Sequence, residues 1–304
     1  MADALPALPE SAETPEAPNE GDAKRMSFLE HLVELRTCLR NSAIAVAVTT
    51  GIAYLFREQL FALMARPLID AWVHAEKVAG IGKPELVFTS PIEAFMVLFK
   101  LSILVGVFGA SPIIFREIWR FISPGLYPKE RRWGLGFIVA SVVLFVGGAA
   151  FAYILVLPEG YKYFLGYSQE SMGVIKEVLG HSIDVRLSTP FDIKPMITMD
   201  EYFGLTSMLL LVFGSVFELP LVLSVLAMLG IVSARQLWKW NRYAVVLFAF
   251  AGAILTPGDM MISQLAMTGS LTILYNLSIL LAVIVGRKRK REAAAAESAL
   301  VEGG

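Results

Sequence analysis

The sequence has very little cysteine and histidine, and these shortages exclude several classes of protein. Cys38 is the single cysteine, so the chain has no internal disulfide and no paired-cysteine metal motif. Its three histidines, His31, His74 and His181, lie outside the long apolar segments, and neither a zinc-hydrolase histidine pair nor a Walker-type glycine loop is present. No serine or cysteine nucleophile can be assigned a base. We therefore expect no enzyme, no cofactor, no metal and no nucleic-acid partner, but a function based on binding and conformational change.

Charge is also scarce. Charged residues make up 17% of the 304 residues, hydrophobic residues make up 56%, and the mean hydropathy is +0.63. Soluble domains usually contain about 25% charged and about 45–50% apolar residues. Long apolar runs recur along most of the chain, which indicates one membrane domain rather than two soluble ones.

Six apolar segments are candidates to cross a hydrocarbon core of about 30 Å. Lipid offers no hydrogen bonds to unpaired peptide groups, and the runs are continuous rather than alternating, so each is expected to be a helix. The predicted fold class is therefore all-α, a polytopic bundle of six transmembrane helices. The expected spans are 41–56, 94–115, 133–157, 202–229, 243–256 and 262–286.

The two ends of the chain differ from this membrane domain, which we place at 26–286. Residues 1–25 form an acidic, Pro-rich tail that is expected to be disordered; it lacks the basic start and apolar core of a signal peptide. Residues 287–304 begin with the basic run 287–291 and continue as a tail rich in Ala and Glu.

Lysine and arginine are distributed unevenly between the two sides of the predicted bundle. Seventeen of them flank one set of connections and the tails, whereas the alternate connections hold eight, together with most of the loop acids. Because cytoplasmic flanks are enriched in these residues, both termini are predicted to be cytoplasmic.

The fifth apolar segment is short. The run from Ala244 to Leu255 covers only about 18 Å as a helix. Three interpretations stay open: the segment dips into the bilayer and returns, the bilayer is thinned around it, or Trp238, Trp240 and Tyr243 extend the helix into the interface.

The stretch 28–36 has apolar residues at near-helical spacing, with Glu30 and Glu34 one turn apart on another face. It is expected to be an amphipathic helix at the cytoplasmic interface, preceding the first span. Two carboxylates at this spacing repel each other, and a cationic partner would relieve the repulsion. The alternative is a solvated face neutralised by Arg36 and Arg40.

The stretch 119–132 combines aromatic residues, a Pro-Gly turn and one acid among several bases. Pro124 and Gly125 favour a tight turn and therefore an ordered loop. The bases follow from the positive-inside rule alone, but Glu130 does not, unless it pairs with Arg131 or Arg132.

An ionisable residue within the fourth span, Glu218, costs about 2.5–3.5 kcal/mol on insertion scales. Pro220 predicts a kink that exposes polar backbone beside this carboxyl group. Glu218 is either a structural interhelical partner or part of a partner-facing site. Pro112 is expected to break the second span in the same way, and Glu93 and Lys100 share a face of that span.

Taken together, these stretches resemble the TatC family, the multi-spanning subunit of the twin-arginine (Tat) protein translocase. The resemblance runs from about residue 26 to residue 286. The stretches that carry it are 31–36, Ser90-Pro91 with Glu93 and Lys100, 119–132, 217–221, and Thr256-Pro257 with Asp259 and Ser263-Gln264.

The resemblance implies a receptor for the Arg-Arg signal peptides of folded exported proteins. Glu34 and Glu130 match the recognition carboxylates of the family. Guanidinium groups pair with carboxylates in strong, often bidentate hydrogen bonds, so lysine should bind less well. The other residues assigned to signal-peptide binding are Arg36, Phe121, Pro124, Leu126 and Arg131.

The resemblance also implies single-span partners, TatA and TatB, which meet the fourth span near Glu218, and self-association in a receptor complex. It places the chain in a bacterial inner membrane, with Asp259 on the periplasmic side, and couples transport to the proton-motive force without ATP. Two alternatives are a small-molecule permease with a site around Lys100 and Glu218, and a membrane scaffold. The chain departs from the family pattern at Gly258, Ser270 and Asn276, and its segment 158–200 is longer.

Overall fold

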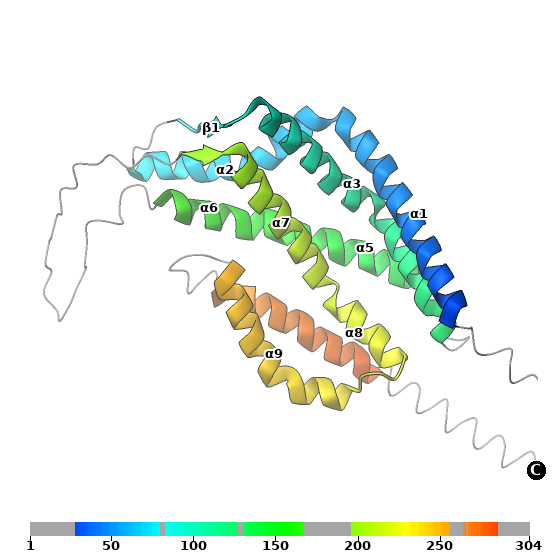
Figure 1. Cartoon of the computed structure of the whole chain (residues 1–304). Coiled ribbons are helices and arrows are strands. Elements are labelled where there is room, and N and C mark those ends of the chain that lie inside the picture. The colour runs from blue at the N-terminus through cyan, green and yellow to red at the C-terminus, as the bar shows by residue number, and fades with distance from the viewer. Residues whose placement is uncertain are drawn as a thin grey trace, which may run out of the picture.

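The computed structural model describes residues 28–79, 83–126, 131–166, 196–255, 264–265 and 267–284. These residues are almost entirely helical, which confirms the predicted fold class (Figure 1). The elements are α1 (Phe28–Leu55), α2 (Arg57–Ala79), β1 (Leu86–Val87), α3 (Pro91–Ile122), η2 (Ser123–Gly125), α5 (Gly134–Phe151), η3 (Ala152–Val156), α6 (Leu157–Gly166), β2 (Ile197–Thr198), α7 (Met199–Phe217), α8 (Leu219–Met228), α9 (Ala234–Leu255) and a last helix at Met267–Ile284.

Five stretches of the described chain are long and apolar enough to cross a membrane. They are His31–Leu55, Pro91–Gly125, Gly134–Lys162, Met199–Met228 and Met267–Ile284. Helix α9 corresponds to the fifth predicted segment and is not one of these five. The amphipathic start expected at 28–36 and the first span form one continuous helix, α1. The third span is also longer than expected, because α5, η3 and α6 follow one another without a break to Gly166.

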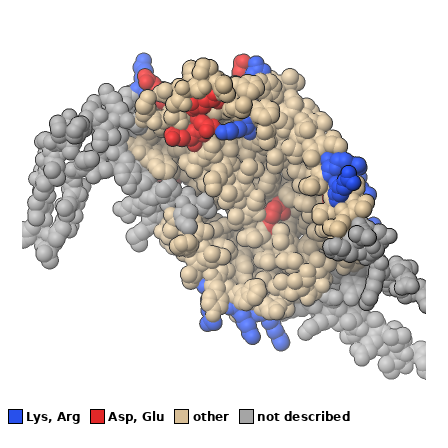
Figure 2. Space-filling model, viewed as in Figure 1, with Lys and Arg blue, Asp and Glu red and all other residues tan. Residues whose placement is uncertain are grey.

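Most charged residues on the face shown in Figure 2 lie towards the edges of the bundle, although an acidic residue also lies in the middle of that face. One edge, here called the basic end, contains the start of α1, the end of α3, and the starts of α5 and α9. The opposite edge, here called the mixed-charge end, contains the start of α2 and the adjoining ends of α3, α6 and α7. The basic end carries Arg36, Arg40, Arg116, Arg120, Arg131, Arg132, Arg235, Lys239 and Arg242.

Helices α1 and α3 are antiparallel and pack closely along their length. Near the middle, Thr49 Oγ1 donates a hydrogen bond to the Gly106 carbonyl over 2.7 Å. A Cβ atom at Gly106 would collide with the backbone and hydroxyl of Thr50. Glycine is therefore required here for the close approach of two helices, as is common at helix contacts in membranes.

Helix α2 was missed by the sequence analysis, which assigned no element to this connection. Its buried residues recur at helical spacing and pack against α6 and the rest of the core. Pro67 lies within α2 and cannot donate to the Leu63 carbonyl, but the Tyr153 hydroxyl donates to that oxygen over 2.6 Å. The buried residues of α2 are Met64, Ala65, Leu68, Ala71 and Trp72.

The expected break at Pro112 is wrong. Helix α3 runs through this residue without interruption. Proline removes one donor, which leaves the Phe108 carbonyl without its helical partner. The Ser111 hydroxyl donates to that carbonyl over 2.7 Å, so the helix continues with the carbonyl satisfied.

The expected kink at Pro220 is confirmed. Helix α7 ends at Phe217, α8 begins at Leu219, and Glu218 is the single residue between them. The Glu218 N–H bonds to the Ser215 carbonyl rather than four residues back, which marks the change of direction. The backbone therefore turns at Glu218, the acid inside the apolar part of this span.

Helix α9 extends well beyond the short apolar run of the fifth segment. Its 22 residues rise about 33 Å, because the helix begins ten residues before the apolar run. Trp238, Trp240 and Tyr243 lie on this helix with exposed side chains. The structure thus matches the extension of the helix by flanking aromatic residues. The last helix packs on α9 through Tyr275, whose hydroxyl donates to the Leu237 carbonyl over 3.0 Å.

Helices α5 and α7 cross at a pair of glycines. A Cβ atom on Gly148 would lie 2.5 Å from the Phe213 carbonyl and 2.8 Å from the Phe217 side chain. A Cβ atom on Gly214 would lie 2.9 Å from the Phe145 ring. The neighbouring Gly147 faces open space instead.

We expect Gly148→Ala to destabilise the bundle by about 1–3 kcal/mol, because the added methyl group overpacks the contact with α7. Gly147→Ala is the matched control and should leave stability unchanged or slightly raised, because alanine favours helix over glycine. Thermal unfolding of the purified chain in detergent measures both. Equal transition temperatures for the two variants would contradict the close approach of α5 and α7.

Candidate functional site

The two antiparallel helices α1 and α3 bring distant parts of the sequence together at the basic end. The His31 ring stacks on the Phe121 ring, with centroids 4.3 Å apart and planes inclined by 20°. Residues 28–36 and the start of the 119–132 stretch, which the sequence analysis singled out separately, therefore meet in one place.

Glu34 lies beside this aromatic pair. Its side chain is 20% exposed, and its Oε2 atom is buried without a hydrogen-bond partner, 4.0 Å from His31 Nδ1. Arg36, two residues further along α1, is exposed. The predicted counter-ion role of Arg36 for Glu34 has no ion pair to support it among the described residues, and Glu34 keeps an unsatisfied acceptor.

The loop after α3 is anchored to the bundle by apolar contacts. η2 forms the turn predicted at Pro124 and Gly125, and Pro124 is exposed. Leu126 is buried in a small cluster with Trp119 and with Val225 of α8. This burial gives Leu126 a part in holding the loop, and its contact with a peptide stays a prediction.

The start of α5 is fitted to α3 at the other side of the loop. A Cβ atom at Gly134 would collide with the Trp119 ring, and the Trp119 and Phe137 rings lie 4.8 Å apart. Arg131 is exposed at the start of this segment. Glu130 and Asp259 lie outside the described residues, so their assignments stay predictions.

Glu218 is buried at the break between α7 and α8, with 8% of its surface exposed. Ser141 on α5 is its polar neighbour. Even so, Glu218 Oε1 and Ser141 Oγ are both buried without a hydrogen-bond partner. The described part of the chain provides no cation for this carboxyl group, which weakens the interpretation of a purely structural interhelical pair.

Glu93 and Lys100 lie at the mixed-charge end, where the start of α3 meets the start of α7. Glu93 accepts hydrogen bonds from the Thr89 N–H and hydroxyl, both 2.7 Å, and from the Asp200 N–H over 3.1 Å. Lys100 Nζ lies 2.6 Å from Asp200 Oδ1. Both residues therefore hold α3 to α7, next to the short parallel pairing of β1 with β2.

Lys100 and Glu218 do not form a common site. Lys100 binds Asp200 at the start of α7, whereas Glu218 follows the end of that helix, about 27 Å away by helical rise. The midspan site on which the permease alternative depended is therefore absent. The described residues also contain no group of His, Cys, Asp and Glu that could hold a metal ion.

Glu117 was missed by the sequence analysis, which took the bases around it as products of the positive-inside rule. Its side chain is only 4% exposed, and its Oε2 atom has no hydrogen-bond partner. Arg120 Nη1 lies 3.9 Å from that oxygen, beyond hydrogen-bond distance. One signal was available in the sequence: an acid one helical turn before Phe121 in an otherwise basic and aromatic stretch.

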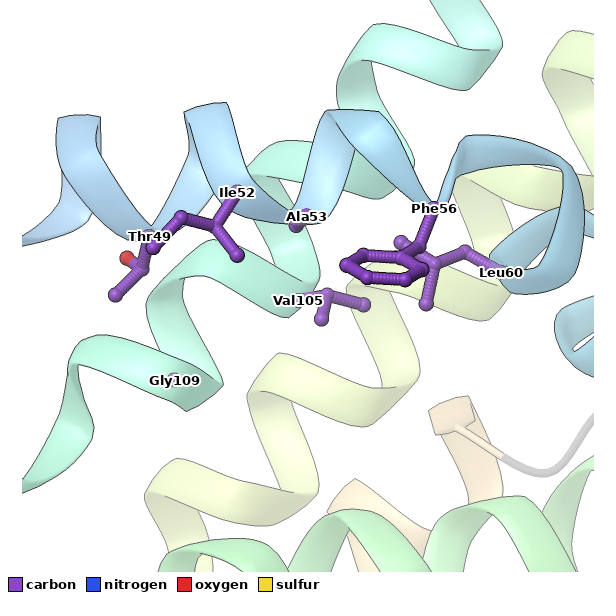
Figure 3. Close-up of a pocket in the computed structure, with 7 residues that line it drawn as sticks. All are labelled: Thr49, Ile52, Ala53, Phe56, Leu60, Val105 and Gly109. Atoms are coloured by element: carbon purple, nitrogen blue, oxygen red, sulfur yellow. The ribbon is translucent and has the colours of Figure 1, made fainter.

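An apolar groove of about 300 Å³ is lined by residues of α1, α3 and the start of α2 (Figure 3). Its one polar side chain, Thr49, already bonds the Gly106 carbonyl. The groove therefore offers packing surface and no reactive group. It is lined by Thr49, Ile52, Ala53, Phe56, Leu60, Val105 and Gly109.

These features define a multi-pass membrane protein in which buried acids at the basic end and within one span have oxygens without hydrogen-bond partners. Comparison with known proteins supports this class. The family model described as "Sec-independent protein translocase protein (TatC)" matches residues 30–269. A TatC of Desulforapulum autotrophicum is 39% identical over 282 residues, 92% of this chain and 93% of that protein. A TatC of Aquifex aeolicus is 34% identical and covers 87% of this chain and 98% of its own length.

A solved structure titled "Crystal Structure of Twin Arginine Translocase Receptor- TatC" is also similar. It has a TM-score of 0.63 at 34% identity and covers 84% of this chain and 100% of its own. The chain therefore belongs to the TatC family. It is a multi-pass inner-membrane protein and a core subunit of the Tat protein translocase, not an enzyme.

The corner at the mixed-charge end yields a prediction on stability. Glu93→Gln should lower stability more than Lys100→Gln, because Glu93 accepts three hydrogen bonds, two of them from backbone N–H groups. The ion pair of Lys100 is about half exposed, and such pairs contribute at most about 1 kcal/mol. Thermal unfolding in detergent ranks the two variants, and a larger loss for Lys100→Gln would contradict this account.

Proposed function

We propose that this chain is the signal-peptide receptor of the Tat translocase, and that its basic end binds the paired arginines of signal peptides. One observation carries the proposal: Glu34 Oε2 is buried beside the stacked rings of His31 and Phe121 without a hydrogen-bond partner. A buried carboxylate oxygen without a partner is costly, and a ligand with N–H donors would satisfy it.

Arginine suits this place better than lysine. Its planar guanidinium group has five N–H donors, binds carboxylates in bidentate geometry and stacks on aromatic rings. Glu34 supplies the acid, and the adjacent His31–Phe121 pair supplies aromatic surface. Glu130 is the second acid of the proposed site, and the exposed Arg36, Pro124 and Arg131 border it.

The proposed orientation places the basic end in the cytoplasm. The described Lys and Arg residues at that end carry the positive charge expected of cytoplasmic flanks. Signal peptides of proteins folded in the cytoplasm would then meet Glu34 before export. Both termini are cytoplasmic in this arrangement, and transport uses the proton-motive force.

TatA- and TatB-like single-span proteins are the proposed partners near Glu218. The acid interrupts an apolar span, the backbone turns beside it, and Glu218 Oε1 has no hydrogen-bond partner. A polar side chain on a partner helix could donate to this oxygen within the membrane.

We expect Glu34→Gln to weaken binding of an Arg-Arg signal peptide at least about tenfold, because one charge-assisted pair is lost. Binding of a fluorescent signal peptide to the chain in nanodiscs measures this, with a Lys-Lys peptide as reference. Glu58→Gln is the control, since Glu58 is an exposed acid at the mixed-charge end. Unchanged affinity in Glu34→Gln would remove this residue from the site.

Glu218→Leu should reduce co-purification of single-span partners several-fold, because it removes the unpaired acceptor while keeping an apolar helix. Ser224→Ala on α8 is the control, since the Ser224 hydroxyl already bonds the Pro220 carbonyl within the helix. Recovery of partners at the wild-type level with Glu218→Leu would contradict the proposed contact.

A further inference from the structure

Glu117 carries an inference that rests on the proposed receptor function. We propose that Glu117 is a further arginine-binding residue: one arginine of the signal peptide enters where α1 meets α3 and pairs with Glu34 and Glu117 together.

Glu117 is buried, and one of its oxygens lacks a hydrogen-bond partner. Its side chain is only 4% exposed, and the unpartnered atom is Oε2. The Glu34 Oε2 atom is in the same condition. A buried charge without a partner is strongly unfavourable, and it persists in proteins where a ligand or function requires it.

Glu34 and Glu117 lie near the same residue, Cys38, where α1 packs on α3. His31, Glu34 and Cys38 are three and four residues apart, so they share the face of α1 that packs on α3. Across the contact, His31 stacks on Phe121 of α3. The Cys38 thiol lies close enough to both Glu117 and Glu34 for their charges to act on it. Glu34 therefore lies between two residues whose neighbours on α3, Glu117 and Phe121, are one turn apart.

Within the described ranges, the carboxylates of Glu34 and Glu117 lack a closely bound cation. Glu34 and Glu117 present two carboxylates, and the nearby guanidinium group is that of Arg120. Arg120 is held loosely: its Nη1 atom lies 3.9 Å from Glu117 Oε2, and its side chain is 57% exposed. A guanidinium group from a ligand can replace Arg120 at Glu117 and can form the direct hydrogen bonds that Arg120, at 3.9 Å, does not make.

The geometry also selects arginine over lysine. A guanidinium group donates in two directions within one plane, so it can bond Glu34 and Glu117 at once and stack against Phe121. A lysine ammonium group is a point charge without a flat face. The preference for Arg-Arg over Lys-Lys therefore depends on Glu117 as well as on Glu34.

The test is Glu117→Gln, which removes the charge but keeps the shape of the side chain. Affinity for the Arg-Arg signal peptide, measured with the full chain in nanodiscs at fixed salt, should fall about tenfold. Affinity for the Lys-Lys peptide should change little, so the ratio of the two affinities falls. Arg120→Gln, in contrast, should keep or increase the affinity, because it removes the competing internal cation.

Peptides in which only one arginine is replaced by lysine distinguish direct binding by Glu117 from a purely structural role of this residue. If Glu117 contacts one of the two arginines, Glu117→Gln and the replacement of that arginine are non-additive, whereas the other replacement adds normally. A purely structural Glu117 would lower the affinity for Arg-Arg and Lys-Lys peptides by the same factor, and that result overturns the inference. Unchanged affinity in Glu117→Gln also overturns it.

The outcome for the wild type distinguishes this inference from the function on which it rests. A wild-type chain that prefers Arg-Arg, loses affinity with Glu34→Gln and is unaffected by Glu117→Gln refutes the role of Glu117 alone. A wild-type chain without preference for Arg-Arg refutes the proposed receptor function. If Glu117→Gln does not fold, Glu117→Asp keeps the charge with a shorter reach, and loss of the Arg-Arg preference in this variant supports the inference, whereas full retention overturns it.

Discussion

The structure depends on one constraint: polar groups inside an apolar bundle need partners, because lipid provides none. Two prolines illustrate how the chain meets it. Pro67 leaves the Leu63 carbonyl to the Tyr153 hydroxyl, and Pro112 leaves the Phe108 carbonyl to the hydroxyl of Ser111. These side chains allow proline within long helices without an unsatisfied backbone oxygen.

Against this background, the acceptors that stay unsatisfied are informative. Oxygen atoms of Glu34, Glu117 and Glu218 are buried without hydrogen-bond partners, although hydroxyl groups elsewhere fill comparable gaps. Two of these acids lie at the basic end and the third at the break between α7 and α8. The proposed signal-peptide and partner contacts involve the same residues, because a ligand would supply hydrogen-bond donors that the chain does not provide to these oxygens.

The two ends of the bundle differ in whether their acidic side chains have hydrogen-bond partners. At the mixed-charge end, Glu93, Lys100 and Asp200 satisfy one another and join α3 to α7. At the basic end, helices α1 and α3 pack closely but leave their acids without matching donors. The acids of the mixed-charge end therefore join helices, whereas those of the basic end keep acceptors without hydrogen-bond partners.

The sequence by itself determined the membrane class, the helical fold and the kink at Pro220, and it singled out Glu34 and Glu218 as candidate site residues. These follow from local properties: hydrophobic length, proline chemistry and an acid in an apolar run. Only the tertiary structure decided the continuity of α3 through Pro112, the pairing of Lys100 with Asp200, and the stacking of His31 on Phe121. Each of these depends on contacts between residues far apart in the chain or on a side-chain conformation, and neither hydrophobic periodicity nor residue spacing encodes them.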